Sequence, residues 1–372
     1  MEYAGSFFDL INSMENNNNI STKKGAAFSF KPMMVVWPIL FGLVGVGYML
    51  WREMRTGIPQ EPLMMANYWW VFAIVVVLLT VVKDFSGMYR LRVMSGMPLT
   101  FRQLFRIRML YEFTSAVTPS AAGGSSLEVL FIHREGVKVS RATSMTILAL
   151  FMDELLMICL FPLLLIFIPY GKLFPSEVFF EHGYLWLFLV GYLMKFVWVT
   201  ILFIGIFVKP SILVKIIGAV FSLKFLRKYR MRALRTAVEI RQCAKEIRGE
   251  SIGYWLRLSA STAGIWIFRF LIANAAIMIF NPLTYMDNVV CFARQYILGI
   301  ISMVVPTPGG SGFAELMFND FLIEYIPQAL SAVVIASIWR LFTYYYYLIA
   351  GVIILPQWFG KSKFIQKRHE SN

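Results

Sequence analysis

The sequence predicts an all-α polytopic membrane protein built as an inverted-topology repeat, with both termini in the cytoplasm. Three observations favour this fold class. Hydrophobic residues make up 58% of the 372-residue chain and charged residues only 15%, which is typical of a chain that lies mostly in lipid. Several apolar stretches reach the roughly twenty residues needed to cross about 30 Å of hydrocarbon. Two more are interrupted by proline and glycine, and cations gather in alternate loops, as expected on the cytoplasmic side.

The first half is expected to hold a polar tail over residues 1–31 and a first membrane repeat over residues 32–169. The tail ends in a run of asparagines and lacks a basic and then apolar opening, so we expect no secretory signal peptide. Within the repeat, the apolar stretches predict spans over residues 32–51, 63–82 and 143–168.

A broken apolar piece over residues 109–132 is predicted to form a re-entrant hairpin. Thr118-Pro119 interrupts it, because proline removes a backbone donor and clashes with the preceding turn. Basic stretches around Arg106 and Arg134 flank its two ends, so we expect both ends on the cytoplasmic side. A pair of short helices that nearly crosses the bilayer is the alternative.

The second half is expected to hold a second membrane repeat over residues 184–355 and a basic cytoplasmic tail over residues 356–372. Its apolar stretches predict spans over residues 184–208, 258–280 and 330–355. The most basic stretch of the chain, the insert over residues 209–257, is expected on the cytoplasmic side as one or two surface helices. It is either an ordinary positively charged inner loop or a contact with anionic lipid headgroups.

A second hairpin is predicted over residues 289–326. The loop before it contains no lysine or arginine, and its far end carries Asp320 and Glu324, so it is expected to enter from the outside. Each half then contains two spans, a hairpin and a third span. Hairpins that enter from opposite leaflets define an inverted repeat, whose binding site typically lies near the midplane between the repeats.

The sharpest break in the chain runs from Pro306 to Gly312. Two prolines and three glycines cannot continue a helix, and backbone groups freed within lipid need protein or trapped water as partners. A helix restarting at Phe313 would direct its free N–H groups at this turn, which suits a phosphate or carboxylate. A tight structural turn is the alternative. The predicted substrate-binding residues of the two hairpin tips are Thr118, Gly123, Gly124, Thr307, Gly309, Gly310 and Ser311.

Charged residues inside the apolar stretches are the remaining candidates, because a charge at the bilayer centre costs about 2.5–3.5 kcal/mol. We expect Arg269 and Arg294 to contact a phosphate, and Glu315 to orient an arginine or meet an amino group. Residues expected to form a charge relay or structural ion pairs are Asp153, Glu154, Lys195 and Arg340.

Composition and spacing argue against several other classes of site. The cysteines at 159, 243 and 291 have no metal-ligand spacing, and the three histidines are scattered, so neither a metal nor a cofactor is expected. The net charge of +14 is interpreted as inner-loop charge rather than as a nucleic-acid surface. A phosphate-binding P-loop does not fit, because no strand precedes the glycines and no lysine follows them at the required spacing.

Two patches resemble the signatures of a known family. Thr118-Pro119 with Ala122-Gly123-Gly124, followed by Arg134-Glu135-Gly136-Val137, resembles the first signature of the lysylphosphatidylglycerol synthase transmembrane family, whose members are also called flippase-like domain proteins. The stretch from Pro306 to Glu315 resembles the second. The resemblance covers most of the chain and implies an integral protein of a bacterial cytoplasmic membrane. The synthases carry a soluble aminoacyl-transferase domain after this membrane part, whereas here a short basic tail follows. The resemblance therefore implies translocation of a polar or anionic phospholipid, without lipid synthesis or other enzyme activity.

Three alternatives remain open at the level of sequence. An ion- or proton-coupled transporter of another amphipathic solute would use Asp153 and Glu154 as proton carriers. A membrane enzyme acting on lipid headgroups would need a nucleophile with its base, or a metal cluster. A non-transporting membrane protein would use the basic insert to dock a partner.

Overall fold

The structure is a computed structural model that describes residues 51, 65–117, 121–174, 183–208, 238, 241–304, 313–326 and 329–356, with the backbone alone described at 121–126 and 329–331. Every regular element in these ranges is helical. Five helices are long and apolar enough to cross a membrane. They are Trp69–Ser95 (α3), Val139–Phe167 (α6), Tyr184–Val208 (α9 with the π-turn η1), Ile252–Met278 (α12) and Ala332–Pro356 (α15 and its continuation).

The observed helices agree with most of the predicted spans. Helices α6 and α9 and the last span begin and end within four residues of the predictions, whereas α12 begins at Ile252, six residues early. The predicted first span lies outside the described residues except for Trp51, as does most of the basic insert. The described part of that insert contains a short helix over residues 241–246.

The prediction for the second span was wrong at its C-terminal end. Helix α3 does not stop at Val82 but continues to Ser95. The basic residues that were expected to lie in a cytoplasmic loop are therefore helical, and Lys83 and Arg90 are buried. Buried charges are tolerated when they are paired: Arg90 pairs with Asp153 of α6, and Lys83 lies beside Asp84 of its own helix and donates to the hydroxyl of Tyr347 on the last helix.

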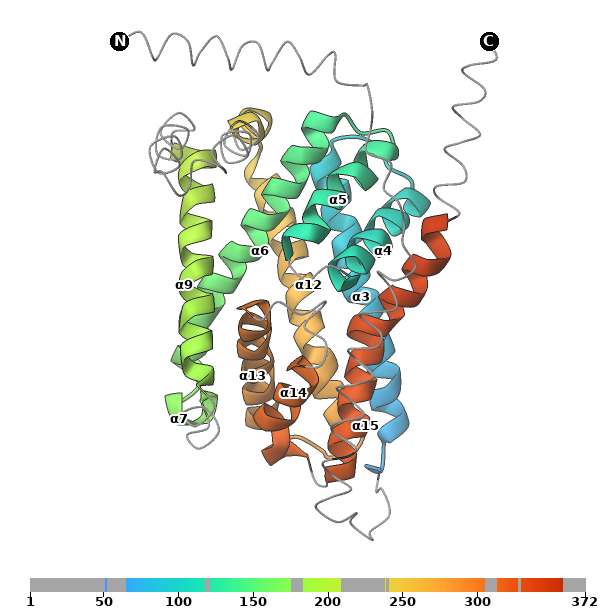
Figure 1. Ribbon diagram of the computed structural model, residues 1–372, viewed down its shortest axis with the longest axis vertical. Helices are drawn as coiled ribbons and strands as arrows, with labels where there is room; N and C mark the ends of the chain where they lie inside the picture. The colour runs from blue at the N-terminus through green and yellow to red at the C-terminus, as the bar shows by residue number, and fades with distance from the viewer. Residues whose placement is uncertain are drawn as a thin grey trace.

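Two helical hairpins occupy opposite halves of the molecule (Figure 1). Phe101–Val117 (α4) descends from the upper end and Ala121–Arg134 (α5) returns to it. Tyr285–Val304 (α13) rises from the lower end, and Phe313–Leu322 (α14) returns to it. At a rise of about 1.5 Å per residue, α4, α5 and α14 are each too short to cross about 30 Å of hydrocarbon.

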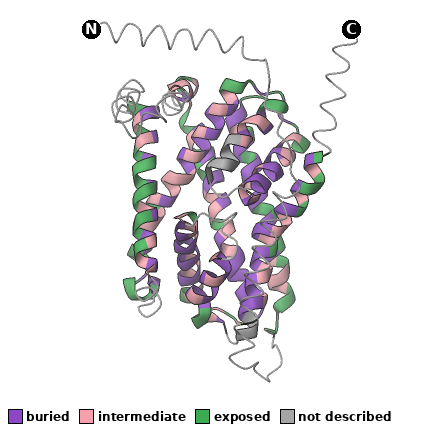
Figure 2. Cartoon of the chain, in the orientation of Figure 1, coloured by how far each residue is buried: buried purple, intermediate pink, exposed green. Residues whose placement is uncertain are grey.

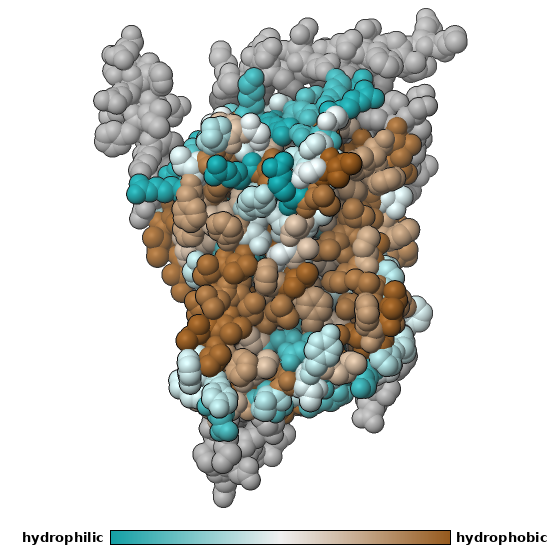
Figure 3. Space-filling model, turned by 180° about the vertical axis from the view of Figure 1, so that it is seen from behind, coloured by the Kyte–Doolittle hydropathy of each residue, from teal (hydrophilic) through white to brown (hydrophobic). Residues whose placement is uncertain are grey.

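The surface has the pattern of a protein embedded in lipid. A broad hydrophobic band crosses the middle of the molecule, and hydrophilic residues gather toward its two ends (Figure 3). The outer side of α9 is exposed whereas α13 is mostly buried (Figure 2). The exposed side chains of α9 are large and apolar, including Trp186, Leu193 and Phe196, so they suit contact with acyl chains.

The interior consists of two apolar clusters, one in each half. The lower cluster joins α13 and α14 to α9, α12 and α15, and the upper cluster joins α4 and α5 to α3 and α6. Residues 346–356 continue the helix after α15 and the π-turn Leu341–Tyr345 (η5), and they pack on α4. Gly351 makes that contact possible, since a Cβ there would lie 2.1 Å from Cγ of Phe113.

Candidate functional site

A buried cluster of charges lies where α4 of the first hairpin meets α3, α12 and the last helix. We call it the first-hairpin charge cluster. Its members are Lys83, Asp84, Arg108, Glu112, Arg269 and Tyr347. Five of the six are buried, and Arg269 is the exception. Sequence analysis selected only Arg269 from this set.

Asp84 contacts three other members of the cluster. Its carboxylate accepts hydrogen bonds from the Tyr347 hydroxyl at 2.9 and 3.1 Å and from Arg108 Nε at 3.4 Å. The Lys83 ammonium lies 3.9 Å from the same carboxylate and donates to the Tyr347 hydroxyl. Gly87 leaves room for Arg108, because a Cβ at Gly87 would lie 2.7 Å from Arg108 Nε.

Glu112 links this arrangement to Arg269 on α12. Arg108 Nη2 lies 2.5 Å from one carboxylate oxygen of Glu112, and Arg269 Nη1 donates to the other at 3.4 Å. The Arg269 side chain is 33% exposed, compared with 3% for Arg108. Arg269 also lies 5.7 Å from the ring centroid of Trp266, so it is the loosely held cation of the cluster.

The cluster contains three cations and only two carboxylates, so it carries one formal positive charge in excess. In a low-dielectric interior such an excess is unfavourable unless an anion or water balances it. The cation that remains accessible is Arg269. The arrangement can therefore accept an anionic group at Arg269 without first breaking the buried contacts of Asp84.

A second set of polar contacts lies beside the cluster, between α3, α6 and α12. Asp153 pairs with Arg90 at 2.5 Å and accepts a hydrogen bond from Trp266 Nε1 at 2.8 Å. Trp266 therefore touches both Arg269 and Asp153. Asp153, which was expected to relay protons or form an ion pair, is held by two donors in this structure. Glu128 of α5 is buried in the same half.

Two more of the predicted residues form a discrete ion pair between α6 and α9. Lys195 of α9 donates to Glu154 of α6 at 2.6 Å, and both side chains are mostly buried. The pair ties α9 to α6 at a position where each charge alone would be costly in lipid.

The charged residues of the second hairpin make separate, closed contacts. Glu315 is fully buried, and Arg340 holds it with Nε 2.9 Å from one oxygen and Nη2 donating to the other at 3.1 Å. The guanidinium also lies against the rings of Trp339 and Tyr344. Such a two-point contact fixes the geometry of both partners.

Arg294, which was expected to contact a phosphate, is bound to protein acceptors instead. Its guanidinium is 2% exposed and donates to the carbonyls of Lys172 and Phe321 and to the Glu324 carboxylate. These contacts join α13 to Tyr170–Leu173 (α7) and to the end of α14. Arg294 thus stabilises the lower end of the molecule. Of the two arginines that were expected to contact a phosphate, Arg269 is the one whose side chain is partly exposed.

The hairpin tips are only partly described. Gly123 and Gly124 lie in the first turns of α5, which begins directly after the Thr118-Pro119 break. Helix α14 begins at Phe313, where the sequence predicted a restart. The candidate residues Thr118, Thr307, Gly309, Gly310 and Ser311 lie outside the described residues.

Sequence reasoning missed Lys83, Asp84, Arg90 and Arg108. Lys83, Arg90 and Arg108 belong to the basic stretch before the first hairpin, which was expected on the cytoplasmic side, and Asp84 was not singled out. The apolar residues around Lys83 and Asp84 were a usable signal. Tyr347 was not among the predicted site residues, and its hydroxyl donates to Asp84 across 263 positions of sequence. In the described parts of the chain, no three histidine, cysteine or acidic side chains gather as a metal site would require.

Together the fold and this site define a polytopic helical membrane protein with two opposed hairpins and a buried, net-cationic cluster. The family described as the lysylphosphatidylglycerol synthase TM region matches residues 35–351, and the chain belongs to this family. It is also similar to a UPF0104 membrane protein of Archaeoglobus fulgidus, with 23% identity over 315 residues that cover 80% of this chain and 90% of that relative. No solved structure matches the chain significantly.

Proposed function

We propose that the protein is a flippase-like transporter that moves a polar or anionic phospholipid between the leaflets of a bacterial cytoplasmic membrane, without covalent chemistry. The single observation that carries the proposal is the first-hairpin charge cluster, with its excess cation and accessible Arg269. The family description, which concerns a lipid synthase's membrane region, supports the same substrate class.

The proposed architecture is an inverted-topology repeat with both termini in the cytoplasm. The two hairpins approach the middle of the molecule from opposite ends (Figure 1), and cations predominate around the upper end, including Arg102, Lys138 and Arg248. The upper end is therefore assigned to the cytoplasm by the positive-inside rule. The first hairpin then enters from the inner leaflet and the second from the outer leaflet, as in transporters that alternate access between repeats.

Headgroup transfer through hydrocarbon is slow, because a solvated charge must lose its water. In the proposed mechanism Arg269 exchanges its 3.4 Å contact with Glu112 for the lipid phosphate, while Arg108 keeps Glu112 paired. The cluster then supplies guanidinium N–H groups in place of water, and the acyl chains stay in the bilayer. Trp266 lines the same position through its contact with Arg269.

Reconstitution of the full chain into proteoliposomes tests the proposal. Fluorescent phosphatidylglycerol and phosphatidylcholine analogues are placed in both leaflets, and a membrane-impermeant quencher reports their exchange. We expect faster exchange of phosphatidylglycerol than in protein-free vesicles, and faster exchange than for phosphatidylcholine. Exchange equal to that of protein-free vesicles for both lipids, with and without a proton gradient, would contradict the proposed function.

A further inference from the structure

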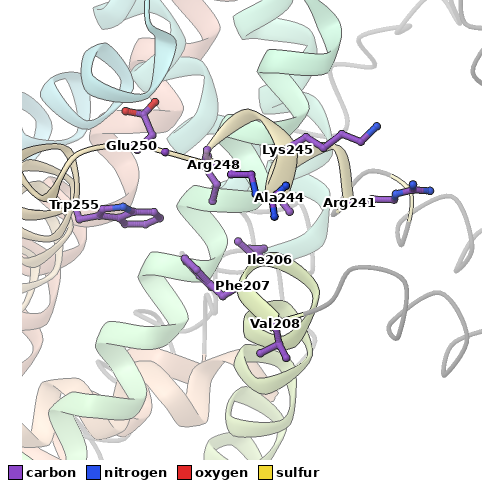
Figure 4. Close-up of a pocket in the computed structure, with 11 residues that line it drawn as sticks. Ile206, Phe207, Val208, Arg241, Ala244, Lys245, Arg248, Glu250 and Trp255 are labelled. Atoms are coloured by element: carbon purple, nitrogen blue, oxygen red, sulfur yellow. The ribbon is translucent and has the colours of Figure 1, made fainter.

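A hollow of about 450 Å³ lies at the upper end of α9 (Figure 4), and none of its described lining residues belongs to the first-hairpin charge cluster. One wall is the π-turn η1 (Ile204–Val208), the opposite wall is the described part of the insert over residues 241–250, and Trp255 of α12 closes one side. We call it the α9 pocket. Its volume is within the range of about 300–1,000 Å³ that is usual for small-molecule sites.

The insert wall presents cations to the α9 pocket. Arg241 and Lys245, four residues apart, lie on the short helix over residues 241–246, and Arg248 lies in the turn that follows it. All three line the pocket. Among the described residues that line the pocket, Glu250 is the acidic one, so this described lining has a formal charge of +2. Among the described residues, no carboxylate forms an ion pair with Arg241 or Arg248.

The opposite side of the same segment is anchored to the protein. Cys243 is fully buried and contacts the Ser144 carbonyl of α6 at 3.5 Å, and Ile247 belongs to the upper apolar cluster. Glu246 lies 3.7 Å from Arg141 of α6. The cations are therefore presented by a segment that α6 holds in place.

The α9 wall is apolar and continues into the hydrophobic band. Phe207 and Val208 are 44% and 57% exposed, and the Phe207 ring lies 5.5 Å from that of Trp255. Along α9, Phe203 and Val197 continue this exposed apolar surface toward the middle of the molecule. Cations above an apolar wall, with tryptophan at the boundary, match the position of a headgroup and its first acyl carbons.

We propose that the α9 pocket binds an anionic glycerophospholipid, with the phosphate at Arg241, Lys245 and Arg248 and the glycerol and acyl chains along Phe207 and Trp255. A soluble phosphate would use the cations but not the apolar wall, whereas a lipid from the adjoining leaflet uses both. The site is separate from the translocation site, and its occupancy does not require that the protein transports lipid.

Native mass spectrometry of the detergent-solubilised full chain tests the proposal by titration with phosphatidylglycerol or phosphatidylcholine. The test variant combines Arg241→Gln, Lys245→Gln and Arg248→Gln. The matched control combines Arg92→Gln, Arg102→Gln and Lys138→Gln, which removes three exposed cations from the same end. Because each cation near an anionic headgroup contributes about a factor of five, we expect about a hundredfold weaker phosphatidylglycerol binding for the test variant and less than a twofold change for the control.

Two further measurements distinguish a phospholipid from other occupants. Trp255→Ala is expected to weaken retention of phosphatidylglycerol severalfold. Glycerol phosphate, added as a competitor, is expected to leave the bound lipid in place. Equal losses in the test and control variants, no preference for phosphatidylglycerol in the wild type, or displacement by glycerol phosphate would each overturn the proposal. If the triple variant unfolds, Arg248→Gln alone is measured, with an expected loss of about fivefold.

Discussion

The two hairpins place their charges in different ways. In the first hairpin, Arg108 and Glu112 belong to a cluster that extends over three other helices and includes a partly exposed arginine. In the second, Glu315 has Arg340 as its ion-pair partner, and Arg294 is bound to carbonyls and to Glu324. In the first hairpin, Arg269 can exchange its contact while the other residues of the cluster keep theirs. In the second hairpin, Arg294 and Glu315 are buried and bound to protein partners.

This difference indicates a division of roles within one fold. A residue in a shared cluster leaves its neighbours with other partners when it moves, so the cluster suits a site whose contacts change during transport. When one partner of a buried ion pair such as Glu315–Arg340 is removed, the other loses its counter-charge, which is costly. We therefore assign headgroup binding to the first hairpin and structural support to the second.

The largest effect is expected for Glu315→Ala. The change leaves the buried Arg340 without its carboxylate, and breaking such a pair typically costs about 3–5 kcal/mol of unfolding free energy. Thermal unfolding in detergent measures it. Glu324→Gln is the matched control, because the Glu324 side chain is 53% exposed and its pairing with Arg294 is expected to contribute less than about 1 kcal/mol. Replacing both partners, with Glu315→Leu and Arg340→Met, should recover most of the loss; similar losses for Glu315→Ala and Glu324→Gln would count against a closed pair.

A smaller effect is expected for Gly351→Ala, which disturbs the packing of the last helix against α4 of the first hairpin. The new Cβ would lie within 2.1–2.5 Å of Phe113 atoms near the backbone of α4, and overpacking of this kind costs about 1–3 kcal/mol. Gly171→Ala serves as the control, since nothing lies within 4 Å of its Cβ position. Equal melting temperatures for the two variants would show that the last helix is not closely packed against Phe113.

Lys83→Met is expected to cost only about 1 kcal/mol of unfolding free energy, although Lys83 is fully buried. Asp84 keeps its contacts with Arg108 and Tyr347, and methionine fills much of the same volume. The substitution also removes the excess positive charge of the cluster, so exchange of phosphatidylglycerol should slow while the protein remains folded. A loss of stability as large as that of Glu315→Ala would contradict the contrast between cluster and pair.

The smallest effect is expected for the chemical labelling of Cys243. Burial raises the pKa of its thiol to about 12 from a usual value of 9. The raised pKa keeps the thiol protonated at pH 8, and since the thiolate is the reactive form, labelling by a maleimide should be slow and should accelerate as the pH rises. The chain carrying Cys243 alone is compared with a chain carrying Lys138→Cys, an exposed position. Equal labelling rates at pH 8 would show that the insert is not docked on α6.

Much of the fold was predictable from the sequence, because uninterrupted apolar stretches such as Val139–Phe167 and Tyr184–Val208 determine a span by length and composition alone. The end of α3 was not predictable in this way. Lys83 and Asp84 look like the start of a loop until their partners are known, and Arg108 and Tyr347 lie 24 and 263 residues away from Asp84. The sequence predicted Arg269 inside an apolar span, and it lies in α12. The sequence could not show that its partner, Glu112, comes from the other half of the chain.

Lipid exchange by an Arg269→Gln variant tests the role of the first hairpin most directly. Arg257→Gln is the matched control, since Arg257 is an exposed arginine of the same helix that donates to the carbonyl of Gly253, one helical turn away. A lost hydrogen bond to a charged group is typically worth about 1.5–3 kcal/mol, so exchange of phosphatidylglycerol should fall about ten- to a hundredfold for Arg269→Gln, with an unchanged melting temperature and little change for the control. Equal exchange rates for the wild type and both variants would contradict the assignment of the headgroup site to the first hairpin.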